Sequence, residues 1–202
     1  RGLGDVYKRQ FYHRQTGVNE FSRQAMLEPI DVAMGKDGML YIGNVRFLNG
    51  EPVSSGPVEM TSQGAHINGL DAYKWISAGY ACHIYGGSTR AYVKPVYEKR
   101  ADISAPVVGI SSGTTVGFRY LQFGNNAPKA VRVVLGSHRK LKLNIRIDSY
   151  NGRIAASMDF NERQTESEVG LTFGIIGKHA VYFEFLSDEA GEIAEFDCFT
   201  FI

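Results

Sequence analysis

The feature that most constrains the fold of this chain is a regular alternation of apolar and polar residues, clearest in the segment 141–147. Such a period of two places successive side chains on opposite faces of a β-strand, so that one face packs inward and the other meets water. The alternating sets are Leu141, Leu143, Ile145 and Ile147 on the apolar face, and Lys142, Asn144 and Arg146 on the polar face.

Segments of the same kind recur through the second half of the chain. The segments 131–135, 169–173, 181–185 and 196–201 are rich in β-branched and aromatic residues, which favour strands. No window combines a helical period with capping residues, and the 23 glycines of the chain fit frequent turns. We therefore predict an all-β fold, a jelly-roll β-sandwich over residues 57–202. The turn signals are Gly124-Asn125-Asn126, Gly136-Ser137, Asn151-Gly152, Gly177-Lys178 and Ala190-Gly191.

The residues before the sandwich have a different organisation. Residues 11–30 predict a hairpin or two edge strands. Such a pair is marginal in water by itself and needs the rest of a domain around it. Residues 31–56 are rich in turn residues and predict a connector with one short strand near 39–42. Residues 1–10 resemble a translated adapter sequence and are predicted to be an artefact, so we set them aside in the fold prediction.

Composition excludes several classes of partner. The 22 basic and 21 acidic residues are interspersed and leave a net charge of +1, which disfavours nucleic acid and anionic membranes. No stretch of about 18 apolar residues occurs, so no membrane-spanning helix is predicted. Cys82 and Cys198 match no metal-ligand spacing. Two unpaired thiols are favoured, with pairing left as the alternative.

Three motifs near the N-terminus carry a family resemblance. They are Tyr12-His13-Arg14-Gln15-Thr16, Phe21-Ser22-Arg23-Gln24 and Glu28-Pro29-Ile30. Together they resemble the end of the five-bladed propeller of family 43 glycoside hydrolases, in the β-xylosidase and α-L-arabinofuranosidase branch. The resemblance implies that the chain is the C-terminal fragment of a polysaccharide hydrolase, with residues 11–30 as the last strands of its propeller.

Residues 57–202 resemble a family 6 carbohydrate-binding module. The resemblance implies a sandwich that binds xylan or arabinoxylan, contacts the propeller and is secreted or periplasmic. The alternative is a purely structural domain that buttresses the propeller and binds no sugar independently. The motifs that carry the resemblance are Ile110-Ser111-Ser112-Gly113 with the strand 116–120, Gly177-Lys178-His179 with the strand that follows, and the closing strand 194–201.

Whether the chain is an enzyme is left uncertain. In family 43 one carboxyl group protonates the leaving oxygen and another activates water. The resemblance implies that both come from earlier blades, so we expect no hydrolysis by this fragment alone. His13 is a possible active-centre residue of the parent enzyme. The alternative is a half-buried strand histidine hydrogen-bonded to the backbone.

The resemblance also implies a structural calcium ion. Glu59 and Asp197 stand where family 6 modules hold Ca²⁺ with carboxylates on the first and last strands. Hard oxygen ligands of this kind suit calcium. Thr61 replaces a second acid that is often present on the first strand, which lowers the charge of the site. The alternative is a pair of solvated or salt-bridged acids.

The expected sugar site departs from the family pattern. The two loops that supply the family's platform aromatics read Val107-Val108-Gly109 and 161–168 here, with no aromatic residue in either. Tyr97 and Tyr92 are the alternative platforms, and Glu195 stands where the family has a binding asparagine. Trp75 is expected to anchor the sandwich or its contact with the propeller.

Overall fold

The computed structural model of the protein describes residues 7–14, 23–36, 38–43, 45–48, 51–54, 61–63, 66, 68–94 and 105–202. Its described elements are β-strands and one short 3-10 helix, η1 (Ala78–Tyr80). None of the described residues form a helix with the length and apolar character needed to cross a membrane.

The strands before residue 55 form small sheets of their own. β1 (Tyr7–Arg14) pairs antiparallel with β2 (Arg23–Met34), and β2 pairs with β3 (Leu40–Gly43). The predicted hairpin is therefore confirmed, and its first strand begins at Tyr7, inside the segment set aside as an artefact.

The segment predicted as a connector contains more strand than expected. β4 (Val45–Leu48) and β5 (Glu51–Ser54) pair with each other, with Leu48 opposite Glu51. The sequence between them is Asn49-Gly50. A two-residue Asn-Gly connection is among the strongest hairpin signals, and it explains this additional pair.

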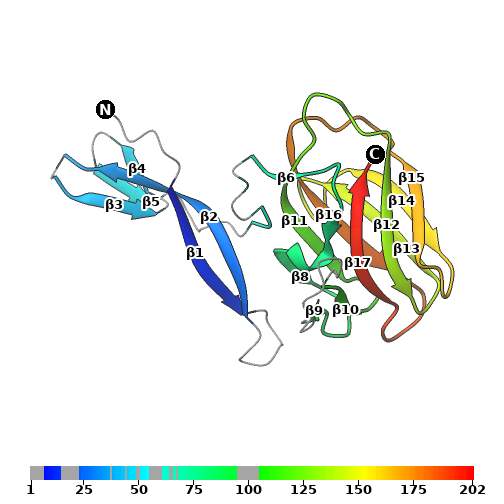
Figure 1. The fold of residues 1–202 in the computed structure, drawn as a ribbon. Coiled ribbons are helices and arrows are strands. Elements are labelled where there is room, and N and C mark those ends of the chain that lie inside the picture. The colour runs from blue at the N-terminus through cyan, green and yellow to red at the C-terminus, as the bar shows by residue number, and fades with distance from the viewer. Residues whose placement is uncertain are drawn as a thin grey trace.

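Residues 70–201 form a β-sandwich of two sheets, which confirms the predicted fold class (Figure 1). The first sheet has the order β15-β12-β17-β10-β9, with β7 paired to β17. Its strands are β7 (Ile76–Ser77), β9 (Tyr92–Val93), β10 (Val107–Ile110), β12 (Ala130–Ser137), β15 (Glu166–Gly170) and β17 (Ala194–Phe201).

The second sheet has the order β14-β13-β16-β11-β6, with β8 paired to β11. Apart from the parallel pair β6 and β11, neighbouring strands run antiparallel. Its strands are β6 (Leu70–Asp71), β8 (His83–Tyr85), β11 (Thr115–Gln122), β13 (Leu141–Ile147), β14 (Ile154–Phe160) and β16 (Lys178–Leu186).

The alternation in 141–147 is confirmed by the burial of β13. Its four apolar residues are all buried and Lys142 is exposed. The turn predicted at Gly136-Ser137 is wrong, because Gly136 and Ser137 are the last residues of β12 and pair with Glu195 and Ala194 of β17. Gly136 stays in the strand because it pairs with Glu195 of the long neighbouring strand β17.

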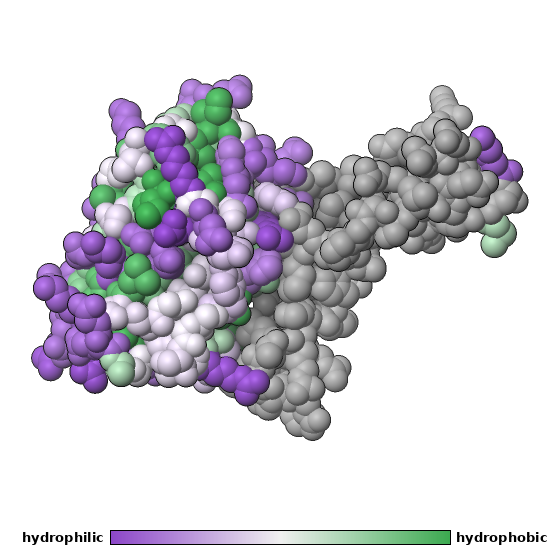
Figure 2. All heavy atoms as spheres, turned by 180° about the vertical axis from the view of Figure 1, so that it is seen from behind, coloured by the Kyte–Doolittle hydropathy of each residue, from purple (hydrophilic) through white to green (hydrophobic). Residues whose placement is uncertain are grey.

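An aromatic cluster joins the two sheets. Phe118 and Phe183 point inward from the second sheet, and Phe196 and Phe199 from the first. The Phe183 and Phe199 ring centroids lie 4.6 Å apart, and those of Phe118 and Phe199 4.8 Å. Such rings dominate the burial of apolar surface in a core. Outside this core, hydrophilic side chains cover much of the sandwich face seen in Figure 2, with smaller apolar patches between them.

Candidate functional site

The outward face of the second sheet carries polar side chains that the strand register arranges in rows. Asn144 of β13 lies opposite Glu184 of β16, which lies opposite Thr115 of β11, and Thr115 in turn lies opposite Tyr85 of β8. This outward face is opposite to the one that carries the buried phenylalanines, because successive side chains on a strand alternate between faces.

A half-buried ion pair organises the middle of this face. Nε and Nη2 of Arg146 both donate to Oε2 of Glu184, at 3.0 and 2.9 Å. Nδ2 of Asn144 donates to the same oxygen at 3.0 Å, and Oγ of Ser157 donates to Oδ1 of Asn144 at 2.8 Å. The side chains of Arg146 and Glu184 are only 20% and 23% exposed. The polar groups on this face are therefore held in fixed orientations.

The next row contains a tyrosine packed flat against the sheet. Tyr182 lies opposite Gly117, where a Cβ would approach the tyrosine ring to 2.7 Å. Glycine at this position therefore leaves room for the ring. Nε of Arg119 donates to the Tyr182 hydroxyl at 2.8 Å, which fixes the far end of the side chain.

Two exposed tyrosines stand beside this network. The rings of Tyr85 and Tyr150 meet edge to face, with centroids 5.7 Å apart, and their residues are 40% and 53% exposed. Burial raises the pKa of the Tyr85 hydroxyl, a hydrogen bond with Thr115 partly offsets this, and the nearby Tyr150, Tyr182 and Glu184 raise the pKa further. Tyr85 lies opposite Thr115, which lies opposite Glu184, so the tyrosine pair and the polar network belong to one surface.

The segment that carries Tyr150 is tied to the network. Tyr150 lies in the connection between β13 and β14, and Nη1 of Arg146 donates to the carbonyl of Gly152 in that connection at 3.0 Å. Gly152 also donates from its backbone nitrogen to the carbonyl of Ser149 at 2.8 Å. Arg146 thus bonds both to the Glu184 carboxylate and to the backbone of the connection that carries Tyr150.

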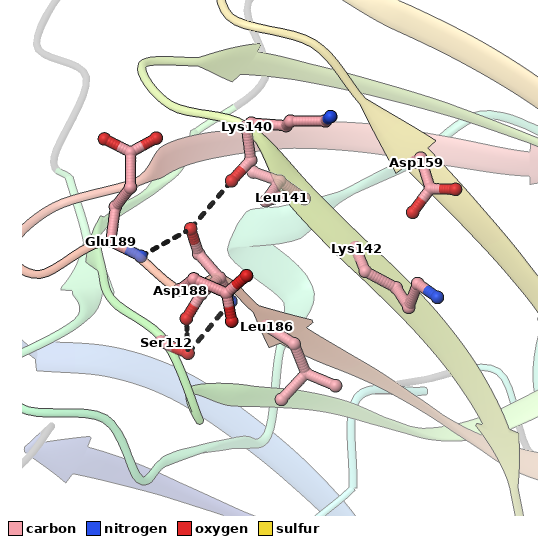
Figure 3. A pocket seen from close by; sticks show the side chains of 9 residues that line it. Ser112, Lys140, Leu141, Lys142, Asp159, Leu186, Asp188 and Glu189 are labelled. Atoms are coloured by element: carbon pink, nitrogen blue, oxygen red, sulfur yellow. Dashed lines mark hydrogen bonds between the residues drawn. The ribbon is translucent and has the colours of Figure 1, made fainter.

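A pocket of about 690 Å³ adjoins this face at the end of the sandwich (Figure 3). Lys142 and Leu186, opposite each other on β13 and β16, lie one row beyond Asn144 and Glu184 and form part of its wall. The remaining lining residues are Ser112, Lys140, Leu141, Asp159, Ser187, Asp188 and Glu189.

Two serines hold the loops around this pocket. Oγ of Ser112 donates to the carbonyl of Ser187 at 2.7 Å and accepts from its backbone nitrogen at 2.9 Å. Oγ of Ser187 donates to the carbonyl of Lys140 at 2.7 Å (Figure 3). The pocket therefore has a fixed rim, and its size lies in the range typical of small-molecule sites, roughly 300–1,000 Å³.

The two described residues that the sequence predicted as sugar contacts lie on the other sheet. Tyr92 is half-buried on β9 and pairs with Val108, and Glu195 is half-buried on β17, so both belong to the first sheet. Tyr97 lies outside the described residues. Trp75 is 53% exposed, so it lies at the surface of the sandwich and not in its core, and its expected contact with the propeller stays a prediction. Its ring lies on the surface because the neighbouring Ala72 and Ile76 fill the core positions of this segment.

The predicted metal and active-centre residues are only partly described. Glu59 lies outside the described residues. His13 lies on β1 and pairs with Gln24 of β2. Asp197 is the extra residue of an irregular pairing on β17, since Val134 pairs with Cys198 and Leu135 with Phe196. Burial raises the pKa of the Asp197 carboxyl, and the charge of Glu195 raises it further. Cys82 and Cys198 are both free thiols.

The tyrosine pair and the ion pair were missed as site residues, although the polar face of 142–146 was visible in the alternation. Lys142 is exposed, whereas Asn144 is buried and Arg146 is half-buried. A strand face that carries an asparagine and an arginine signals a polar network with an acidic residue on a neighbouring strand, here Glu184 of β16. The contribution of Tyr85 and Tyr150 has no local signal, because they come from a short strand and a connection far apart in sequence.

Comparison with known proteins identifies the fold. The structure resembles a family 43 arabinoxylan arabinofuranohydrolase from Bacillus subtilis, solved with cellotetraose (TM-score 0.60, 17% identity), over 89% of this chain and 34% of that one. It also resembles a family 6 carbohydrate-binding module from Clostridium cellulolyticum, solved with xylose (TM-score 0.54, 19% identity), over 66% of this chain and 99% of the module. A family 6 module from Bacillus halodurans that binds β-1,3-glucan matches with a TM-score of 0.55 and 16% identity, over 66% and 98%.

The chain thus spans about a third of the length of the Bacillus subtilis enzyme and nearly the whole length of the modules. No protein-family profile and no curated protein matches the sequence. At these identities the likeness establishes only the fold, a β-sandwich like that of family 6 modules. What the site can bind must be inferred from the residues of this chain.

Proposed function

We propose that this chain is a non-catalytic carbohydrate-binding domain whose sugar site is the outward face of the second sheet. The observation that carries the proposal is the exposed pair Tyr85 and Tyr150 beside the fixed network of Arg146, Glu184 and Asn144. Sugar rings present C–H groups that pack on aromatic faces, and hydroxyl groups that need directed donors and acceptors. This surface offers both within one sheet.

The proposed ligand is plant cell-wall polysaccharide of the xylan or arabinoxylan class. Support comes from the sequence resemblance to family 43 hydrolases and from the structural likeness to a family 43 enzyme and to family 6 modules. In this proposal residues 11–30 are the last strands of a propeller, the parent protein is a glycoside hydrolase that is secreted or periplasmic, and the sandwich holds it near its substrate.

Titration calorimetry tests this function. The purified chain is titrated with xylohexaose, arabinoxylan oligosaccharides and, as a comparison, cellohexaose and a β-1,3-glucan oligosaccharide. We expect saturable binding of the xylan class that is lost in the variant Tyr85→Ala/Tyr150→Ala. Binding that persists in this double variant places the sugar site elsewhere, and heat changes indistinguishable from dilution for all four ligands contradict the function.

The alternative function is a structural domain that supports the propeller. The exposed ring of Trp75 and the nearby Tyr73, which are 53% and 42% exposed, favour it. Adding the chain to a family 43 catalytic domain that lacks its own sandwich distinguishes the two. A rise in the melting temperature of the catalytic domain that Trp75→Ala abolishes, with no sugar binding by this chain, supports the structural function.

A calcium ion is also proposed at Asp197, with Glu59 as its partner. The half-burial of the Asp197 carboxyl beside Glu195 supports it, because two nearby carboxylates repel each other and a cation offsets that repulsion. Melts in the presence of calcium and of a chelator test it. Superimposable curves contradict the proposed ion.

A further inference from the structure

A mixed cluster of one histidine and two glutamates lies at the end of the sandwich, away from the proposed sugar face. His138 follows β12, Glu192 lies in the connection between β16 and β17, and Glu195 is on β17. The imidazole and the two carboxylates each offer a ligand atom, and these atoms all lie within 4.8 Å of one another. Two segments that are distant in sequence, the end of β12 and the start of β17, thus converge on one point.

The backbone fixes the segments that carry these side chains. Gly136 and Ser137, just before His138, pair with Glu195 and Ala194. The backbone nitrogen of His138 donates to the carbonyl of Ile193 at 2.9 Å.

Ile193 itself is fully buried, and its backbone nitrogen donates to the carbonyl of Ile110 at 2.7 Å. The cluster is therefore attached to the core through Ile193, one of the two residues between its glutamates. The loops that carry its ligands cannot separate without breaking this ladder.

The cluster also has a supporting donor and an unbalanced charge. The backbone nitrogen of Gly109 donates to Oε1 of Glu192 at 2.8 Å, which orients that carboxylate, as outer-sphere partners of metal ligands do. Within the described part of the chain, no lysine or arginine forms an ion pair with Glu192 or Glu195. The carboxylate oxygens of Glu192 and Glu195 lie within 4.8 Å of each other, so their charges repel. A cation at this point relieves the repulsion.

We propose that His138, Glu192 and Glu195 bind one zinc-class divalent transition-metal ion. An imidazole with two carboxylates is a ligand set that zinc accepts in tetrahedral geometry, whereas calcium takes oxygen ligands only. His138 and Glu192 are exposed, so a water completes the coordination. The ion ties the connections 138–140 and 187–193, which also line the pocket through Lys140, Asp188 and Glu189. Its role is structural, and it does not depend on sugar binding.

Zinc titration of the chelator-stripped chain tests this site. By calorimetry we expect one Zn²⁺ per chain and a raised melting temperature. His138→Ala and Glu195→Gln each weaken the affinity by at least about tenfold, since loss of even an outer-sphere partner costs 10–100-fold. The matched controls His66→Ala and Glu162→Gln change exposed residues outside the cluster and leave the affinity unchanged.

Two further measurements keep the outcome unambiguous. In chelator no variant should melt below the wild type, which shows that the substitutions do not act by unfolding the chain. Glu195→Gln should melt slightly higher there, because it removes a repelling charge. X-ray absorption at the zinc edge must show nitrogen and oxygen ligands. Sulfur ligands from Cys82 or Cys198, affinity that survives His138→Ala, equal loss in the controls or no zinc binding at all would each overturn the proposal.

Discussion

Tyr85 of β8 and Tyr150 of the connection after β13 meet edge to face, with ring centroids 5.7 Å apart, although they are distant in sequence. Both rings remain exposed. Tyr85 lies near Glu184, and Tyr150 lies in the connection whose Gly152 carbonyl accepts a hydrogen bond from Arg146. This relationship defines the proposed site, because neither tyrosine by itself offers a platform next to fixed hydrogen-bonding groups.

We expect Tyr85→Ala and Tyr150→Ala to weaken oligosaccharide binding without unfolding the domain. Each removes an exposed ring, so each should cost at least about 1 kcal/mol of binding free energy, or about fivefold in Kd. Tyr80→Ala is the matched control, since Tyr80 is 54% exposed on η1 and has no part in the site. Calorimetry with xylohexaose measures all three. Equal affinity of the wild type and both site variants contradicts the assignment.

Loss of the central carboxylate, Glu184, should reduce the stability of the domain. Glu184→Gln removes the charge that accepts two bonds from Arg146, and leaves a half-buried guanidinium with a weaker partner. We expect the free energy of unfolding in urea to fall by about 1–3 kcal/mol. Glu168→Gln disrupts the exposed pair with Arg132 on the first sheet and should have a much smaller effect. Equal decreases in the free energy of unfolding for the two variants would show that the half-buried pair stabilises the domain no more than the exposed pair does.

The carboxyl of Asp197 makes stability depend on pH. Burial raises its pKa above the ordinary 3.8, and the charge of Glu195 adds to this. A raised pKa means that the folded state binds the proton more tightly than the unfolded state, so protonation of Asp197 stabilises the fold. This contribution to the free energy of unfolding is complete below about pH 3.8 and is lost as the pH rises through the folded-state pKa.

In chelator, Asp197→Asn should therefore be more stable than the wild type at pH 7, and the difference should shrink toward pH 3.5. Denaturant unfolding across this range measures it. If calcium binds as proposed, adding it reverses the order at pH 7, because the wild type then gains the energy of the ion. A difference that does not change with pH contradicts the stated cause.

The thiol of Cys198 should react slowly in the folded protein. Burial, followed by the charges of Asp197 and Glu166, raises its pKa to about 11. At pH 8 only about a thousandth of such a thiol is thiolate, the reactive form, compared with about a quarter of an ordinary thiol. We expect labelling by a disulfide reagent to be at least tens of times slower than in denaturant. Cys82→Ser isolates the Cys198 signal, and fast labelling of the folded variant contradicts the prediction.

The aromatic cluster should carry much of the core stability. Phe183 is fully buried between Phe118, Phe196 and Phe199, so Phe183→Ala should cost about 3–5 kcal/mol of unfolding free energy. Phe173 is only partly buried and stacks under Arg153, and Phe173→Ala is expected to cost clearly less. Thermal and urea unfolding of the two variants compares them directly.

The N-terminal hairpins illustrate how local signals decide local structure. Turn residues between short apolar runs predicted the pair β1 and β2, and the Asn49-Gly50 dipeptide accounts for β4 and β5. The proposed propeller origin of residues 11–30 stays a prediction, because a hairpin can pair in the same way inside or outside a propeller.

The sequence by itself determined the all-β class and the inward faces, because a period of two forces alternate side chains to opposite sides of a strand. It could not determine the site. Glu184 meets Arg146 only through the pairing of β13 with β16, and Tyr85 meets Tyr150 only because β8 pairs with β11 beside them. The convergence of His138, Glu192 and Glu195 likewise depends on the pairing of β12 with β17. Contacts between distant segments depend on sheet order and register, and only the tertiary structure fixes these.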